Sequence, residues 1–114
     1  MPLLPNRERA VIDPEKISGY LLDREHPEGG PKALFFFAMG FAAERAEDLA
    51  AALLAHTEEP VSSTSETTFG VKYVIDGPFR ASGGRTRMLR SVWIVDEGED
   101  RPRFVTAYPL EEQP

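Results

Sequence analysis

Residues 69–76, FGVKYVID, mark the point where the hydrophobic pattern of the chain changes from helical to strand-like. Side chains alternate here with a period of two, which is typical of a strand with one buried face. Two later segments, 85–95 and 103–110, are also strand-like, and they are separated by an acidic turn at 96–100. The second half of the chain therefore predicts an antiparallel meander, in which Asp76-Gly77-Pro78 closes the first strand.

The first half of the chain carries helical patterns instead. An Asp-Pro-Glu sequence at 13–15 is typical of a helix start, and the apolar spacing that follows predicts a helix ending near Asp23. Pro31 and Gly40 frame a second, short helix. Residues 46–54 repeat leucine and alanine at helical spacing and predict a third. The serine- and threonine-rich segment 58–68 is interpreted as a loop that joins the helical half to the sheet.

This order of elements predicts an α+β fold. We expect one domain over residues 1–114, in which N-terminal helices pack on one face of a three- or four-stranded antiparallel sheet formed by the C-terminal half. The periodic positions of the helices and of the second strand should meet in one hydrophobic core: Phe36, Leu49, Leu53, Val92 and Ile94.

The composition excludes several classes of site. The chain has no cysteine, which rules out disulfides, thiolate zinc sites and a cysteine nucleophile. It begins without the apolar core of a signal peptide, and no apolar run approaches the ~20 residues that cross a bilayer. The acidic turn at 96–100 lacks the spacing of a calcium loop. We therefore expect a cytoplasmic protein with no membrane contact, no metal and no cofactor.

The net charge of −6 disfavours indiscriminate binding to nucleic acid, which depends on summed positive potential. The charge is uneven, however, because residues 70–95 contain five basic residues and one acid. Lys72, Arg87 and Arg90 are the candidates there for binding an anionic substrate. The alternative is an ordinary solvated strand face.

The segment 26–40, HPEGGPKALFFFAMG, holds the most chemically suggestive pair, His26 and Lys32. Pro27 and the two glycines indicate a loop whose backbone can approach a ligand. Lys32 falls in the first turn of the following helix, where amides without helical partners point outward. A lysine, a histidine and such amides together indicate an oxyanion or phosphate site. The alternative is a solvated lysine beside a loop histidine.

The last predicted strand adds two hydroxyls. Thr106 and Tyr108 are two residues apart, so they project from the same face about 6.6 Å apart and can donate to one phosphate. Phe104 should share that face, which leaves a partly buried aromatic stripe as the alternative. Of the other candidates, we expect Trp93 in the core and His56 at the surface near a helix end.

Four segments together resemble a small bacterial family catalogued as domain of unknown function 6883. They are HPEGGPKA at 26–33, FGVKY at 69–73, RSVWIV at 90–95 and PRFVTAYP at 102–109. The order of a histidine- and lysine-bearing helical segment before a sheet that ends in TAYP also resembles the barnase, EndoU, colicin and RelE group of metal-independent RNases. That resemblance implies His26, Lys32, Thr106 and Tyr108 as catalytic residues and a role among bacterial toxins. The acidic net charge departs from that group, whose members are commonly basic.

The function that this resemblance implies is an endoribonuclease acting on RNA, with a cognate antitoxin protein as a second partner. His26 would transfer protons, Lys32 would stabilise negative charge, and Thr106 and Tyr108 would orient the phosphate. The alternative is a non-catalytic protein-binding module, either antitoxin-like or an acidic mimic of nucleic acid. The sequence leaves the oligomeric state open.

Overall fold

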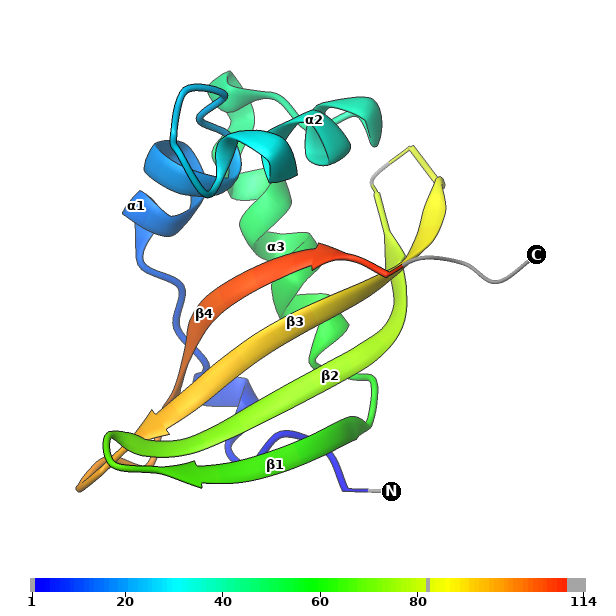
Figure 1. The fold of residues 1–114 in the computed structure, drawn as a ribbon. Coiled ribbons are helices and arrows are strands. Elements are labelled where there is room, and N and C mark those ends of the chain that lie inside the picture. The colour runs from blue at the N-terminus through cyan, green and yellow to red at the C-terminus, as the bar shows by residue number, and fades with distance from the viewer. Residues whose placement is uncertain (1, 82, 111–114) are drawn as a thin grey trace.

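The computed structural model describes residues 2–81 and 83–110, and over these ranges the chain forms a four-stranded antiparallel sheet in the order β1-β2-β3-β4. The helices lie on one face of this sheet, as Figure 1 shows, and the α+β prediction is confirmed. The strands are β1 Val61–Thr67, β2 Gly70–Arg80, β3 Thr86–Asp96 and β4 Pro102–Pro109. Within the described residues, no helix is long and apolar enough to cross a membrane.

The helical half follows the sequence signals closely. The helical elements are η1 Arg7–Arg9, α1 Pro14–Lys16, η2 Ile17–Leu21, α2 Gly30–Ala38, η3 Ala43–Arg45 and α3 Ala46–His56. The side chain of Asp13 caps α1 by accepting from the amide of Glu15 at 3.0 Å. Gly40 follows α2 with φ of +103°, the left-handed conformation in which glycine carries no steric penalty.

Two expectations about the strands were wrong. The segment interpreted as a loop contains β1, an edge strand whose residues after Val61 are all exposed. An exposed strand of serine and threonine has no apolar alternation, so the periodicity that identifies buried strands is missing. Asp76-Gly77-Pro78 also does not end a strand, because β2 continues through it to Arg80 in register with β3.

The core lies between the helices and one face of β3, but not the face that was predicted. Phe36, Leu49 and Leu53 are fully buried in it as expected. Val92 and Ile94 are buried on the opposite face of β3 and are absent from this cluster, so their assignment to it was wrong. The residues of β3 that face the helices are those at odd positions, Leu89, Ser91 and Trp93, and Trp93 is core as predicted.

A β-bulge in β4 separates Phe104 from the two hydroxyl residues that follow it. Trp93 pairs with Phe104 and Val92 with Thr106, so β4 has one extra residue, Val105, between these pairs. Phe104 therefore faces the core, where its ring meets Trp93 at 5.3 Å between centroids. The expectation that Phe104 shares a face with Thr106 was wrong for this reason.

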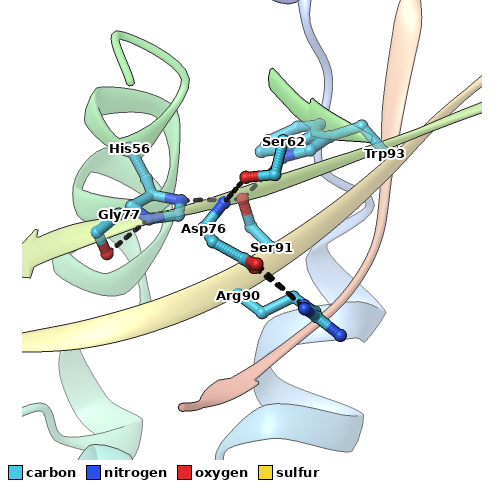
Figure 2. Close-up of polar contacts among 7 residues, drawn as sticks. All are labelled: His56, Ser62, Asp76, Gly77, Arg90, Ser91 and Trp93. Carbon is cyan, nitrogen blue, oxygen red and sulfur yellow. Dashed lines mark hydrogen bonds and ion pairs between the residues drawn. The ribbon is translucent and has the colours of Figure 1, made fainter. Parts of the chain in front are cut away.

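His56 at the end of α3 is buried, contrary to the expectation of a surface residue. Figure 2 shows how it joins α3 to the sheet. The indole of Trp93 donates to Ser91 Oγ at 2.9 Å, Ser91 lies 2.7 Å from His56 Nδ1, and His56 Nε2 lies 3.1 Å from the carbonyl of Gly77. Because the carbonyl can only accept, the neutral ring donates from Nε2 and accepts from Ser91 at Nδ1. The polar side-chain atoms of Trp93, Ser91 and His56 are thereby all hydrogen-bonded.

Substitution of Leu53 tests the packing of α3 on the sheet. Leu53→Ala should lower the free energy of unfolding by about 2 to 5 kcal/mol, because it leaves a cavity in a fully buried position. Leu54→Ala is the matched control, since Leu54 is 38% exposed and its loss should cost under about 1 kcal/mol. Urea unfolding measures both, and equal effects would contradict the assigned burial.

The burial of His56 predicts a pH dependence of stability. Burial lowers the pKa of His56 below its ordinary value, and the Gly77 carbonyl and the carboxylates of Glu59 and Asp76 oppose this shift without cancelling it. On acidification below about pH 6.5 the unfolded chain takes up a proton at His56 that the folded chain does not. The free energy of unfolding should therefore decrease as the pH is lowered.

His56→Gln should remove this contribution, because glutamine does not titrate. Urea unfolding of the protein and the variant between about pH 7.5 and pH 5.5 measures the two slopes. His26 and the carboxylates are present in both proteins, so the difference between the slopes isolates His56. Identical slopes would show that His56 is not held neutral by the fold.

Candidate functional site

His26 organises the turn that leads into α2. Its Nδ1 accepts hydrogen bonds from the amides of Glu28 and Gly29, each at 3.0 Å, and its carbonyl accepts from the amide of Gly30 at 2.8 Å. The sequence predicted that amides at this helix start would be free to bind an anion. These three are already engaged, so they do not contribute to an anion site here.

The two glycines of this turn allow a close backbone contact. A Cβ on Gly29 would lie 2.1 Å from the carbonyl oxygen of Tyr20, and one on Gly30 would lie 2.5 Å from that of Arg24. Such distances are far inside van der Waals contact, so a larger residue would push the turn away from η2. The glycines were expected to admit a ligand, but what they bring close is the backbone around Tyr20.

A cluster of polar side chains forms where α2 lies beside the edge strand β4 (Figure 1). The ammonium of Lys32 donates to the phenol oxygen of Tyr20 and, at 2.9 Å, to Thr106 Oγ1. The two hydroxyls of Tyr20 and Thr106 are themselves 2.9 Å apart. Lys32 Nζ also lies 4.8 Å from the ring centroid of Tyr20 and 5.6 Å from that of Tyr108. We call Tyr20, Lys32, Thr106 and Tyr108 the lysine cluster.

The fold therefore brings the four predicted catalytic residues into one neighbourhood. Lys32, Thr106 and Tyr108 belong to the lysine cluster, and His26 borders it through an edge-on contact with the ring of Tyr20, with 5.0 Å between centroids. Proximity is a property of the fold, and the catalytic role of these residues stays a prediction.

Tyr20, at the centre of these contacts, was missed. It belongs to the apolar stripe of η2, where Ile17 and Leu21 are buried, but its own side chain is only partly buried. The signal in the sequence was its hydroxyl, because a tyrosine beside core residues needs a hydrogen-bond partner for that group.

The electrostatics of the lysine cluster favour negative charge. Burial raises the pKa of the Tyr20 phenol, but hydrogen bonds with Lys32 and Thr106 and the charges of Lys32 and Lys16 outweigh burial and hold that pKa below its ordinary value. Lys16 Nζ lies 5.3 Å from the centroid of the Tyr20 ring. Among the described residues no carboxylate pairs with Lys32, whose contacts are to neutral hydroxyls and aromatic rings.

A row of three side chains crosses the sheet next to this cluster. Asp76 pairs with Arg90, and Arg90 with Tyr108, as direct neighbours on adjacent strands. The guanidinium of Arg90 binds both carboxylate oxygens of Asp76, at 2.7 and 2.8 Å, as Figure 2 shows. Hydrogen bonds to Asp76, which has the larger effect, and to Tyr108 raise the pKa of Arg90 above its ordinary value. Arg90 thus links Tyr108 to an acid, and its charge is largely balanced by that acid.

The other two predicted substrate-binding residues lie elsewhere. Lys72 is exposed on the same face of the sheet as Asp76, but four residues along β2 place it about 13 Å away. Arg87 lies on the helix-facing side of β3, 5.6 Å from the ring centroid of Phe35.

Two of the four carboxylates of the acidic turn are engaged by arginines. Asp96 binds Arg103 at 2.7 Å, and Asp100 binds Arg9 at 2.9 Å. Within the described part of the chain, no three histidine, aspartate or glutamate side chains are grouped as a metal ion requires.

Comparison with known proteins places the chain in a family. No curated protein matches its sequence. Among solved structures, the fold is similar to that of a chain in a contact-dependent growth inhibition toxin and immunity protein complex from Klebsiella pneumoniae 342. The TM-score is 0.69 over 93% of this chain and 97% of that one, and the identity of 18% makes this a likeness of fold alone. Residues 3–111 match the domain of unknown function (DUF6883), and the chain therefore belongs to that family.

Proposed function

We propose that this protein is a metal-independent endoribonuclease of the bacterial toxin type. The observation that carries the proposal is the state of Lys32. Its ammonium is partly buried, is held by two hydroxyls, and has no carboxylate partner among the described residues. A cation that is positioned but not neutralised attracts an anion, and a phosphate fits because it also accepts hydrogen bonds from hydroxyls.

The geometry suits cleavage of a phosphodiester. When a ribose 2′-hydroxyl attacks the adjacent phosphate, negative charge builds up on the phosphate oxygens in the transition state. Lys32 would stabilise that charge, and Thr106 and Tyr108 would orient the oxygens. Two side chains that can exchange protons, those of His26 and Tyr20, lie beside Lys32.

The assignment to toxins has separate support. The fold is similar to that of a chain in a complex of a growth inhibition toxin with its immunity protein. We infer from this likeness that the protein acts in a toxin and immunity pair with a dedicated protein partner, and the state of Lys32 is what favours the toxin over the immunity protein. The net charge of −6 disfavours general RNA binding, so recognition should depend on a particular RNA structure near the lysine cluster.

The alternative is a non-catalytic protein-binding module. It is favoured by β1, an edge strand whose residues after Val61 are exposed and which lies at the free edge of the sheet. Exposed edge strands offer unpaired backbone groups to a strand of another protein. In this case the protein would bind a partner through β1 and would leave RNA intact.

Lys32→Met should abolish most of the activity, because it removes the charge and keeps much of the side-chain volume. We expect the rate of cleavage of total bacterial RNA to fall by about 10²- to 10³-fold, together with any growth arrest on expression in bacterial cells. Arg45→Ala is the control, since it removes an exposed positive charge on η3 whose partner is Asp48 of α3.

The controls separate the two functions. Lys32→Met should keep the circular dichroism spectrum and melting temperature of the unmodified protein, so that lost activity reports chemistry and not unfolding. Full activity of Lys32→Met would remove Lys32 from the site. Absence of both RNA cleavage and growth arrest in the unmodified protein would favour the protein-binding module.

EDTA should leave the cleavage rate and the melting temperature unchanged, because Lys32 would supply the positive charge that a metal ion provides in metal-dependent nucleases. Both are measured before and after chelation, beside a metal-dependent nuclease as a positive control. Loss of activity that Mg²⁺ restores would show that the reaction uses a metal.

A further inference from the structure

The hydrogen bonds of His26 restrict what its ring can do. Nδ1 accepts from the amides of Glu28 and Gly29, so it carries no hydrogen, and the neutral ring has its hydrogen on Nε2. A ring in this state can donate from Nε2 but has no free nitrogen lone pair to receive a proton. Receiving one at Nδ1 would break both bonds of the turn before α2. In this conformation His26 is therefore poorly placed to act as a general base.

Tyr20 has the opposite environment. Its phenol oxygen receives a hydrogen bond from the ammonium of Lys32 and lies 2.9 Å from the hydroxyl of Thr106, which can also donate. Lys16 approaches the ring from α1, and the ring of His26, in the turn before α2, packs against it nearly at a right angle. The charges that act on the Tyr20 phenol, those of Lys32 and Lys16, are both positive. Together these contacts stabilise a phenolate oxygen.

We propose, on the basis of the ribonuclease function above, that the phenolate of Tyr20 is the general base that takes the proton from the ribose 2′-hydroxyl. The 2′-oxygen then forms a bond to phosphorus, and the bond from phosphorus to the 5′-oxygen breaks. The departing 5′-oxygen takes a proton from water, and the hydroxide left behind takes the proton from Tyr20. The products are a 2′,3′-cyclic phosphate and a 5′-hydroxyl, and Tyr20 returns to its starting state.

This assignment gives each neighbour a different task. Lys32 both stabilises the phenolate and contacts the phosphate, so it couples the base to the charge that develops in the reaction. His26 positions Tyr20 by holding the turn that packs against η2, where Gly29 lies against the Tyr20 carbonyl. The mechanism also fixes the substrate as RNA, because a DNA strand of the same sequence has no 2′-hydroxyl.

Tyr20→Phe tests the assignment, because it removes one oxygen and preserves the ring that contacts His26 and Lys32. Its kcat/KM on total bacterial RNA should fall by about 10²- to 10⁴-fold, with the melting temperature unchanged. Tyr73→Phe is the matched control, since Tyr73 lies on the core side of β2 and should keep full activity. The kcat/KM of the unmodified protein should rise with pH, and this rise should be absent in Tyr20→Phe.

A second measurement follows the phenol directly. The ultraviolet absorbance of phenolate, recorded against pH, should show one tyrosine that ionises at lower pH than the others. That transition should disappear in Tyr20→Phe and should move to higher pH in Lys32→Met, whether or not RNA is present.

The outcomes separate this inference from the function on which it rests. Cleavage by Tyr20→Phe at the rate of the unmodified protein, with Lys32→Met inactive, would overturn the role of Tyr20 and leave the ribonuclease intact. A pH rise that persists in Tyr20→Phe and is lost in His26→Ala would assign the base to His26 instead. Absence of RNA cleavage by the unmodified protein, or equal cleavage of single-stranded DNA, would overturn both.

Discussion

The register of β3 is the constraint on which the rest of this structure depends. β3 pairs with both β2 and β4, and its buried side chains at odd positions face the helices. A slip of one residue would turn Trp93 to the open face and Arg90 into the core, where its charge would have no partner. Ser91 helps to fix the register, because its hydroxyl accepts from Trp93 and contacts the buried ring of His56. The bulge at Val105 then sets the orientation of the end of β4.

The fold could be predicted wherever a buried face imposed a period on the sequence. The helices and the first part of β2 follow that rule, since their apolar residues repeat at about 3.6 or 2 residues. β1 could not be recognised, because an exposed edge strand of serine and threonine buries nothing that would produce a pattern. The inner face of β3 could not be chosen either. Its apolar residues occupy both parities from Leu89 to Val95, and the pairing with Phe104 that decides between them is a tertiary contact.

The sequence identified Lys32, Thr106 and Tyr108 as candidates but did not show how these side chains are connected. Lys32 and Thr106 are 74 residues apart, and what joins them is the packing of α2 beside β4, which local sequence does not specify. Tyr20 was hidden because its spacing matches the core stripe of η2. For His26 the opposite holds. Its place in the loop before α2 was predicted, but the role of its Nδ1 in capping that turn was not, because this role depends on two backbone amides.

The arrangement around Lys32 is not the one that stability alone would favour. The chain has 19 acidic residues against 13 lysines and arginines, so carboxylates are plentiful. Ion pairs in the described part form at Arg9, Arg45, Arg90 and Arg103, while Lys32 is surrounded by hydroxyls and rings. Partly buried charge without an opposite charge costs free energy, and such local conflicts concentrate at functional sites. A phosphate at this position would supply the missing negative charge, and its oxygens would compete with the phenol of Tyr20 for the same ammonium. Substrate binding and the protonation of Tyr20 would then be coupled through a single side chain.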